Sequence, residues 1–364
     1  MDHKGRQQRL RDVLSAHRLD ALLVTHLPNI LYLCGFTGSA GALLVTESRS
    51  VFFTDGRYTQ QARAEVQASK IVIAHKSPLA AAAEWLAAQN KRSRRAAPFR
   101  LGIEGEHLTV AARTRLAAVL PSHVRLREAP PLVEQARAVK DVEEIARIRA
   151  AVLMGASLFD RALDVILPGV QETEVARAME YAARKAGAQG MSFPTIIASG
   201  ERSALPHGRA SKATIPEGFV VCDFGVILTD YCSDMTRTVF VGRPSEEARR
   251  IYQAVKDAQQ VAVEVVRAGV SASEVDGAAR KSLQKCGLAK YFTHSTGHGV
   301  GLEIHEAPRI AGGQPETLKP GMVITIEPGV YVRGKWGVRI EDMVVVTEQG
   351  CEILTPTSKE LIAI

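Results

Sequence analysis

Four acidic residues and one histidine in the second half of the chain could bind metal ions together: Asp223, Asp234, His298, Glu327 and Glu341. Asp223 and Glu327 each end a strongly apolar run, and an ionised carboxylate there costs several kcal/mol unless a cation compensates it. Four such acids carry too much negative charge for one arginine, whereas a pair of divalent cations resolves the conflict. His298 adds a neutral ligand, and its flanking glycines leave room for the imidazole at a crowded centre.

Other motifs in the same segments have weaker support. Asp223-Phe224-Gly225 also occurs in protein kinases, but the chain has no Gly-rich phosphate loop and no His-Arg-Asp segment. No capped helix is expected after Gly297-His298-Gly299-Val300-Gly301, so this is not a dinucleotide-binding fingerprint. His305-Glu306 lacks a second histidine four residues on, which excludes the helical zinc-protease motif. A single acid is more often a satisfied core carboxylate, but five residues in paired positions are poorly explained that way.

An internal repeat relates the segments that carry these residues. Residues 169–187 match residues 269–287 at seven of nineteen positions, with a constant shift of 100, where chance would give about one identity. The register continues with a shift of 103, from Ile215-Pro-Glu-Gly-Phe-Val to Leu318-Lys-Pro-Gly-Met-Val. Thr173 and Ser273 occupy matching positions and are expected to cap the second helix of each copy. Two copies of helix, helix and hairpin predict one curved antiparallel sheet with helices on its outer face.

The first part of the chain predicts a different domain. Apolar runs at 21–24, 42–45, 51–53 and 71–73 predict strands, and residues 109–120 predict a helix. Pro130-Pro131 is the clearest break, so we expect domains at 1–131 and 132–364. Soon afterwards, Asp141 and Glu144 have the spacing of a capping box at a helix start.

Composition limits the class of protein and its partners. The 364 residues, 46% hydrophobic and 23% charged, suit two globular domains. No signal peptide or membrane span is apparent, and five cysteines without C-x-x-C spacing favour a reducing compartment, so we expect a cytoplasmic protein without a membrane partner. The net charge of +7 suggests nucleic acid. However, the densest basic run, residues 91–95, contains no aromatic residue to stack on a base, so we expect no nucleic-acid partner.

The C-terminal motifs together resemble the pita-bread metallopeptidases, the family of methionine aminopeptidase, prolidase and aminopeptidase P. The matching segments are LPHGR (205–209), DFG with SDMTRT (223–238), HSTGHGVGLEIHEAP (294–308), IEPGVY (326–331) and RIED (339–342). The resemblance implies two divalent metal ions, with Asp234 and Glu341 bridging both, Asp223 holding one, and His298 with Glu327 holding the other. It also implies that His207, His294 and His305 line the substrate site and that Arg339 orients a metal-binding carboxylate.

The N-terminal part resembles the creatinase/prolidase N-terminal domain through GFTGSAG (35–41) and TDGRY (54–58). The expected fold class is therefore α+β: a creatinase-like α/β domain followed by a pseudo-two-fold pita-bread domain. Methionine aminopeptidases lack the first domain, so the resemblance favours the proline-specific branch. By analogy with that branch we also expect a homodimer.

The expected activity is that of an Xaa-Pro aminopeptidase acting on proline-containing peptides. Two cations would share a water and lower its pKa toward neutrality, and the oxygen-rich ligand set favours Mn²⁺, with Co²⁺ or Zn²⁺ as alternatives. Glu327 would move the proton, and a protonated His294 or His305 would donate to the oxyanion. His207 and Tyr231 are candidates for a pocket around the proline ring.

Three alternatives remain open at this point. The first is an Xaa-Pro dipeptidase, or prolidase, for which Arg309 matters: in prolidases the matching arginine lies near the terminal carboxylate of the substrate. A guanidinium can bind that carboxylate with two parallel hydrogen bonds. The second is a metal-free relative such as creatinase, which the intact ligand set disfavours. The third is a non-catalytic pita-bread binding protein.

Overall fold

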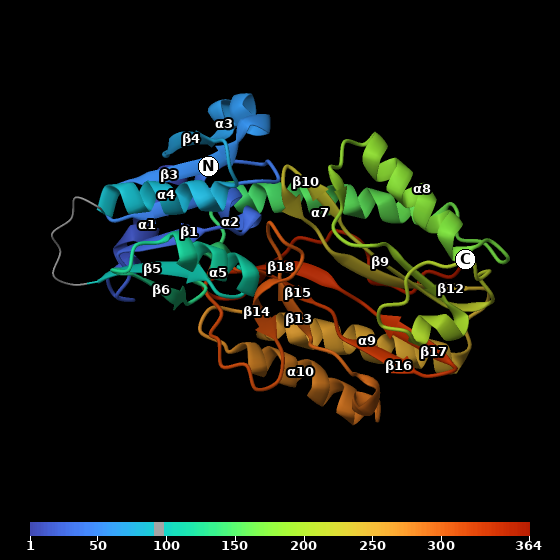
Figure 1. Cartoon of the computed structure of the whole chain (residues 1–364). Helices are drawn as coiled ribbons and strands as arrows, with labels where there is room; N and C mark the ends of the chain where they lie inside the picture. Colours follow the sequence, from blue (N-terminus) through green and yellow to red (C-terminus); the bar gives the residue numbers. More distant parts are fainter. Residues whose placement is uncertain (91–97) are drawn as a thin grey trace. The chain divides into compact units, whose positions relative to one another are not determined.

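The structure is a computed structural model that describes residues 1–90 and 98–364 (Figure 1). The chain divides into two compact units, Met1–Arg137 and Ala138–Ile364. Pro130 and Pro131 precede a short helix, α6 (Leu132–Ala138), as is usual for proline at a helix start. This helix belongs almost wholly to the N-terminal unit, so the division follows α6. The basic run at 91–95 lies outside the described residues.

The N-terminal unit is built on a six-stranded mixed sheet with the order β4-β3-β2-β1-β5-β6. The four strands predicted from apolar runs are all present, because each run supplies β-branched or large apolar side chains, which are buried at 21–24, 42–45 and 51–53 and half-buried at 71–73. The strands are β1 (Ala21–Val24), β2 (Ala42–Thr46), β3 (Ser50–Asp55), β4 (Lys70–Ala74), β5 (Phe99–Glu104) and β6 (Val124–Ala129). The other α-helices of this unit are α1 (His3–Leu14), α2 (Leu27–Cys34), α3 (Thr59–Glu65), α4 (Pro78–Asn90) and α5 (Val110–Val119).

The C-terminal unit combines two pairs of helices with short strands. The helices are α7 (Val142–Leu163), α8 (Glu172–Lys185), α9 (Glu246–Val265) and α10 (Ala272–Lys285). The strands are β7 (Gly190–Met191), β8 (Ile196–Ser199), β9 (Gly218–Phe224), β10 (Val226–Leu228), β11 (Tyr231–Cys232), β12 (Met235–Val241), β13 (Gly297–Gly299), β14 (Glu306–Ile310), β15 (Val323–Ile326), β16 (Gly329–Val332), β17 (Trp336–Arg339), β18 (Asp342–Val346) and β19 (Cys351–Ile353).

The strands of the C-terminal unit pair antiparallel, as predicted, but they form several hydrogen-bonded sheets and not one continuous sheet. The main ones have the orders β12-β9-β8 and β14-β13-β15-β18-β19. The two halves meet where the Glu341 N–H donates to the Thr236 carbonyl at 3.1 Å. The structure thus keeps the α+β fold class and adds a break between its halves.

The repeat seen in the sequence is also present in the hydrogen bonds. The N–H of Gly169 donates to the carbonyl of Ile215 at 2.9 Å, and the N–H of Gly269 donates to the carbonyl of Leu318 at 3.0 Å. These pairs differ by the same shifts, 100 and 103, that align the two copies in sequence. In each copy the loop before the second helix is therefore fixed to the start of the following β-segment in the same way.

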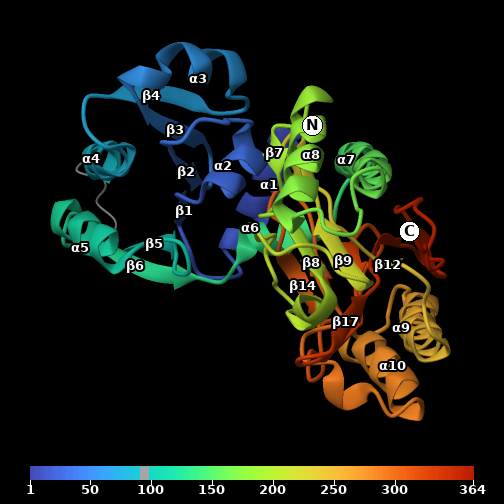
Figure 2. The same cartoon turned by 90° about the vertical axis from the view of Figure 1, so that its right-hand side faces the viewer.

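Each repeat has its own hydrophobic core. One core joins α7 and α8 to β9 and β12, through residues such as Val175, Met179 and Val220. The other joins α9 and α10 to β15 and β18, through residues such as Val255 and Ile324. In Figures 1 and 2 the strands β9 and β12 lie between the two helix pairs. The two cores do not include the polar residues at the ends of β9, β12, β15 and β18, and these residues are available to form a site.

The helix starts differ from the sequence prediction in one respect. The capping box at Asp141 and Glu144 is confirmed, with the Glu144 N–H donating to the Asp141 carboxylate at 2.9 Å. Thr173 and Ser273, however, are not N-caps. Gln171 and Ser271 hold those positions, since each forms an extended β-bridge immediately before the helix begins. Ser271 forms a complete capping box with Glu274, whereas the Gln171 side chain makes no capping bond.

We predict that Ser271→Ala lowers the free energy of unfolding by about 1 kcal/mol, because the Glu274 N–H loses the hydroxyl that caps it and the Glu274 carboxylate loses its hydrogen bond from that hydroxyl. Gln171→Ala is the matched control, since it alters the equivalent position of the other repeat where no cap exists. Urea denaturation of both variants measures the difference. Equal losses in the two variants would contradict the prediction.

Candidate active site

Two antiparallel strand pairs bring the four acids together. Asp223 lies near the end of β9 and Asp234 directly precedes β12, which pairs with β9. Glu327 follows β15 and Glu341 directly precedes β18, which pairs with β15. In each pair, one acid stands where the first strand ends and the other where the second strand begins. Antiparallel pairing places these two points side by side.

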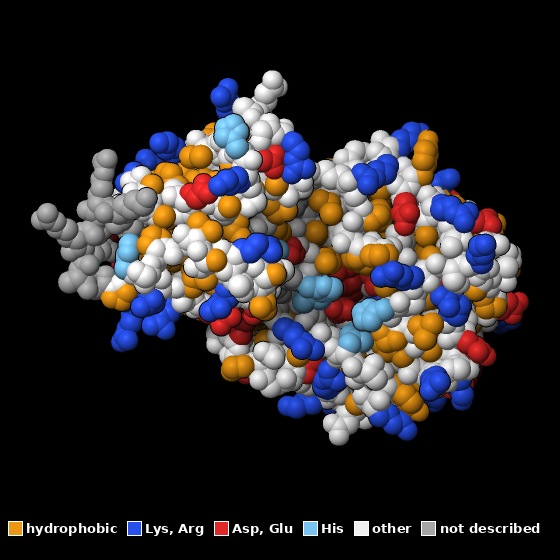
Figure 3. Space-filling view, viewed as in Figure 1, with side chains coloured by type: hydrophobic (Ala, Val, Ile, Leu, Met, Phe, Trp, Pro, Cys, Tyr) orange, Lys and Arg blue, Asp and Glu red, His pale blue; other side chains and the backbone are white. Residues whose placement is uncertain are grey.

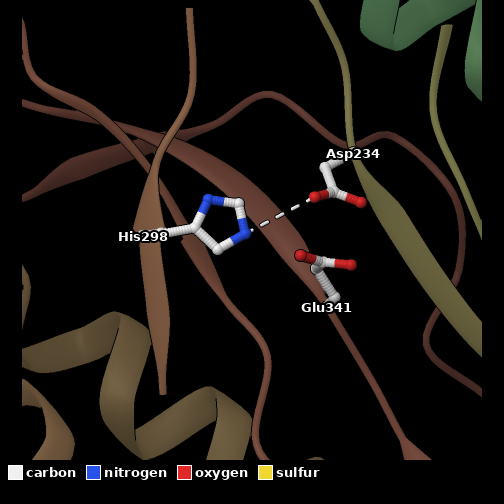
Figure 4. A group of neighbouring side chains, drawn as sticks. All are labelled: Asp234, His298 and Glu341. Atoms are coloured by element: carbon white, nitrogen blue, oxygen red, sulfur yellow. Dashed lines mark ion pairs between the residues drawn. The ribbon is translucent and has the colours of Figure 1, made fainter. Parts of the chain in front are cut away.

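His298 reaches the same place from β13, the neighbour of β15. Its Nε2 atom lies 3.6 Å from an Asp234 carboxylate oxygen and 3.6 Å from a Glu327 carboxylate oxygen. Possible ligand atoms of Asp234, His298 and Glu341 all lie within 4.8 Å of one another (Figure 4). The structure thus brings together residues from both repeats that lie more than a hundred positions apart in sequence.

The His298 ring presents a lone pair to these carboxylates. Its Nδ1 lies 3.0 Å from the Gly299 carbonyl, which can only accept a hydrogen bond, so Nδ1 carries the proton. Burial lowers the pKa of His298 to about 4, so the imidazole is neutral at pH 7 and Nε2 is unprotonated. The contact drawn in Figure 4 is therefore not an ion pair at that pH. A nitrogen lone pair that faces carboxylate oxygens is suited to binding a cation between them, and a hydrogen bond from the other ring nitrogen to a carbonyl is typical of metal-binding histidines.

The buried carboxylates also lack enough cationic or hydrogen-bonding partners. Among the described residues, one buried oxygen of Asp223 and one of Asp234 have no hydrogen-bond partner. Burial, and then the neighbouring carboxylates, raise the pKa values of Asp234 and Glu341 well above their ordinary range. Burial also raises the pKa of Glu327 to about 8. These residues therefore fit divalent cations, which would satisfy the orphaned oxygens and offset the repulsion.

The buried side chain of Arg339 forms hydrogen bonds to several residues of the site. Its guanidinium donates to the Asp223 carboxylate, to the Tyr331 hydroxyl at 2.6 Å and to the Thr236 hydroxyl at 3.1 Å. The Thr236 hydroxyl in turn donates to a Glu341 carboxylate oxygen at 2.9 Å. Burial alone lowers the pKa of Arg339, but Tyr331, Asp223 and other acids outweigh it and raise that pKa well above its usual value. Arg339 is thus a fixed cation that orients acids without neutralising all of them.

Sequence reasoning gave no role to Thr236 or Tyr331. A signal for Thr236 was available, because residues two apart on a strand share a face and Thr236 follows Asp234 by two positions. Tyr331 belongs to the matched segment IEPGVY, but only the fold shows that its hydroxyl joins Arg339 to His294.

A cavity of about 730 Å³ lies over the acidic cluster. Figure 3 shows histidine side chains around a hollow whose floor is red with carboxylates. The predicted site residues that line it are His207, Asp223, Asp234, His294, His298, His305, Arg309, Glu327, Arg339 and Glu341. Apart from Tyr231, the predicted site residues are therefore gathered around one cavity.

Tyr231 lies elsewhere. Its side chain is fully buried, and its hydroxyl donates to the Glu144 carboxylate of α7 at 2.9 Å. A ring packed into the core beside α7 cannot contact a substrate in the cavity. The substrate contact predicted for Tyr231 is corrected accordingly, and the residue instead links β11 to α7.

His294 does not have the protonation state expected from sequence. Burial, reinforced by Arg339, lowers its pKa to about 4, so it is neutral at pH 7. Its Nδ1 lies 2.8 Å from the Ser295 carbonyl and carries the proton, so Nε2 accepts from the Tyr331 hydroxyl at 2.9 Å. Both nitrogens are therefore engaged, and His294 has no N–H free to donate to an oxyanion in this arrangement. Burial also lowers the pKa of His305, but a neutral imidazole keeps one N–H to donate.

Arg309 lies beside the metal-binding candidates. It is the direct cross-strand partner of His298 in the β13–β14 pair, and such partners project from the same face of a sheet. Its side chain is exposed, lines the cavity and has no hydrogen-bond or ion-pair partner among the described residues. A free guanidinium next to a cation site can bind an anionic group of a ligand held there.

The fold and the site together define a metal-dependent hydrolase. The chain matches metallopeptidase family M24 over residues 146–348 and the creatinase/prolidase N-terminal domain over residues 6–139. The protein belongs to metallopeptidase family M24 and is a metal-dependent peptidase.

Full-length relatives support this assignment. The chain is 38% identical to the uncharacterized peptidase YqhT of Bacillus subtilis, over 98% of this chain and 99% of that one. It is 35% identical to the Xaa-Pro dipeptidase of Pyrococcus horikoshii, over 98% of both chains.

Solved structures of relatives share this fold. The Xaa-Pro dipeptidase from Bacillus anthracis superposes with a TM-score of 0.94 at 38% identity, covering 100% of both chains. The X-Pro aminopeptidase from Thermotoga maritima gives a TM-score of 0.88 at 34% identity, covering 99% of this chain and 100% of that one. Among the described residues no helix is long and apolar enough to cross a membrane.

We predict that Glu341→Gln stabilises the metal-free protein by roughly 1–3 kcal/mol, because it removes one of several mutually repelling buried charges. The same change should abolish the stabilisation that added Mn²⁺ gives to the wild type. Thermal unfolding with and without metal, together with metal counting, measures both effects. A variant that is destabilised without metal, yet still binds two ions, would exclude Glu341 from the ligand set.

Proposed function

We propose that the protein is an Xaa-Pro dipeptidase, which hydrolyses the bond between an N-terminal residue and a C-terminal proline. The sequence favoured an Xaa-Pro aminopeptidase and kept the dipeptidase as the alternative. Two of the relatives above, from Pyrococcus horikoshii and Bacillus anthracis, are named Xaa-Pro dipeptidases. These full-length similarities favour the alternative, and so does the position of one arginine.

The position of Arg309 carries the proposal. It stands opposite His298 across the β13–β14 pair, with an unpaired guanidinium at the cavity. In an Xaa-Pro dipeptide the terminal carboxylate belongs to the proline itself, so it lies close to the bond that is cut. A guanidinium near the cation site can bind that carboxylate with two parallel hydrogen bonds. In a longer peptide the carboxylate has moved away by at least one residue.

Five residues would hold a pair of divalent cations: Asp223, Asp234, His298, Glu327 and Glu341. The donor set is rich in carboxylates with one imidazole, which favours Mn²⁺ over Co²⁺ or Zn²⁺. When bound, such a pair supplies Lewis acidity and lowers the pKa of coordinated water toward neutrality.

The residues of the chain divide the remaining tasks. Glu327 lines the cavity beside the place where the cations would bind, so its carboxylate can take a proton from the attacking water and pass it to the departing proline nitrogen. Neutral His305, at the exposed side of the cavity, keeps one N–H for the carbonyl oxygen of the scissile bond. Arg339 holds Asp223 in place throughout.

Apolar side chains at the cavity wall can receive the proline ring. Phe193, Pro194 and Ile304 line the same cavity as His207, and a mostly apolar wall with a few polar groups is typical of small-ligand sites. These residues take the role that sequence analysis gave to Tyr231.

For the oligomeric state and the cellular location we keep the expectations from the sequence as proposals. We propose a homodimer in the cytoplasm, as in the proline-specific branch that the chain resembles. Light scattering of the purified protein measures the oligomeric state, and a monomer at micromolar concentration would contradict the first part.

We predict that a chelator abolishes activity on Xaa-Pro dipeptides and that Mn²⁺ restores it, because the cations would supply the Lewis acidity and the activated water that the side chains alone do not. Activity would be measured on metal-stripped protein whose metal content is known from elemental analysis. Full turnover without metal would rule out the proposed site chemistry.

We predict that Arg309→Ala lowers kcat/KM for Xaa-Pro dipeptides, by an amount that corresponds to a loss of roughly 2–3 kcal/mol of transition-state stabilisation. The kcat/KM for Xaa-Pro tripeptides should be unchanged. Arg309→Lys keeps the charge but not the two-bond geometry, so it should recover only part of the loss. The two substrate series would be assayed side by side on wild type and both variants.

Matched losses on dipeptides and tripeptides, or no change on either, would mean that Arg309 does not bind the terminal carboxylate. In that case the aminopeptidase assignment becomes the better one. Metal content of the variants serves as the control, because Arg309 lies next to His298 but is not a ligand candidate.

A further inference from the structure

His207, His294 and His305 line the cavity from loops, whereas His298 lies on strand β13. His207 follows a short 3₁₀ helix, η2 (Gly200–Ala204), and its exposed side chain has no hydrogen-bond partner among the described residues. His294 follows another, η3 (Ala289–Tyr291), and precedes β13. The position of each imidazole therefore depends strongly on how its loop backbone is held.

An ion pair between the buried Glu172 carboxylate and the partly exposed Arg202 side chain holds the loop of His207. Glu172, the first residue of α8, is fully buried, and its carboxylate accepts from the backbone N–H of Ser199 at 2.8 Å and of Ser211 at 3.1 Å. It also accepts from Arg202 Nε at 3.0 Å. Arg202 then donates from Nη2 to the Arg209 carbonyl at 2.8 Å. One carboxylate thus fixes both ends of the loop, and its arginine fixes the backbone two residues after His207.

A second ion pair holds the loop of His294. Asp276 of α10 is 1% exposed and accepts from Arg280 Nε at 2.7 Å and from the Thr296 hydroxyl at 2.8 Å. Arg280 donates to the carbonyl of Phe292 at 3.1 Å and to that of His294 itself at 2.6 Å. The ion pair thus binds the loop backbone before and at the histidine, and the Thr296 side chain after it.

Each ion pair holds a loop that carries a cavity histidine, but the two pairs do not occupy matching positions of the two repeats. At the shift of 100 that relates α8 to α10, Asp276 matches Ala176 and Arg280 matches Glu180, so neither member of the second pair has a counterpart in the first repeat. The common outcome is therefore not a by-product of the duplicated helix. Each half has its own carboxylate and arginine, and each pair is directed at a loop that carries a cavity histidine.

We propose that Glu172–Arg202 and Asp276–Arg280 are positioning pairs that set the places of His207 and His294 for the reaction. The inference rests on the proposed function, because both histidines line the cavity in which the substrate would bind. An error of about 1 Å in the placement of such a group can cost on the order of a hundredfold in rate. A purely structural role would instead stabilise the fold without distinguishing one histidine from the other.

Double-mutant cycles separate the two roles. Arg202→Met and Arg280→Met remove the guanidinium but keep an apolar stem, and each should lower kcat/KM by roughly tenfold or more. In a His207→Ala background, Arg202→Met should cause little further loss, while Arg280→Met should keep its full effect. In a His294→Ala background the pattern should be reversed, because effects that act through one group are not additive.

Controls address folding and ordinary surface charge. Arg161→Met removes an exposed arginine of α7 that pairs with Asp164 at 3.0 Å, and it should leave kcat/KM unchanged because such pairs contribute little. Arg202→Lys and Arg280→Lys retain the charge and should restore part of the activity. Thermal unfolding and metal content are measured on every variant, and the Lys variants serve for the cycle if a Met variant does not fold.

The outcomes distinguish the inference from the function on which it rests. Full activity of both His207→Ala and His294→Ala would contradict the site roles in the proposed function. Large losses in the histidine variants, combined with arginine effects that multiply equally in both backgrounds, would overturn the positioning role alone. The crossed pattern supports it.

Discussion

The main constraint on this structure is that four mutually repelling carboxylates are buried in one place, so the rest of the fold must hold them together. Asp223, Asp234, Glu327 and Glu341 share a single guanidinium, that of Arg339, and they face a histidine that is neutral at pH 7. Without cations this arrangement raises the pKa of three of the acids and leaves two carboxylate oxygens without partners among the described residues. Buried, mutually repelling charges lower the free energy of unfolding of the ligand-free protein. Such a loss is characteristic of a ligand-binding site, because a bound ligand raises the free energy of unfolding again.

The duplicated architecture is the means by which the chain overcomes that repulsion. Each repeat has its own hydrophobic core, one around α7 and α8 and the other around α9 and α10. These cores fix β9 with β12 and β15 with β18, and the acids stand at the ends of those strands. The apolar side chains thus supply the free energy that holds the charged ends together, and the polar link from Glu341 to Thr236 joins the two halves.

The same division of labour extends to the cavity above the acids. Strands position the residues proposed to bind metal, whereas loops position His207 and His294 and strand β14 positions Arg309. Strand residues are held by continuous ladders, but loop residues need separate anchors, and buried carboxylates on α8 and α10 supply them. Loops that carry functional groups on a rigid scaffold are common in enzymes. In this protein His207 and His294 therefore depend on anchors that the residues at the strand ends do not need.

The amino-acid sequence by itself determined the repeat, the strands of the N-terminal sheet, the capping box at Asp141 and the types of residue at the site. These features are local or periodic, so they can be recognised without knowing which distant segments meet. The tertiary structure alone decided that Tyr231 packs against Glu144 and not in the cavity, and that Gln171 and Ser271 begin their helices. It alone decided the neutral state of His294, because the lowered pKa depends on burial and on the charge of Arg339, which is distant in sequence. Burial and long-range partners are properties of the assembled fold, and no spacing along the chain encodes them.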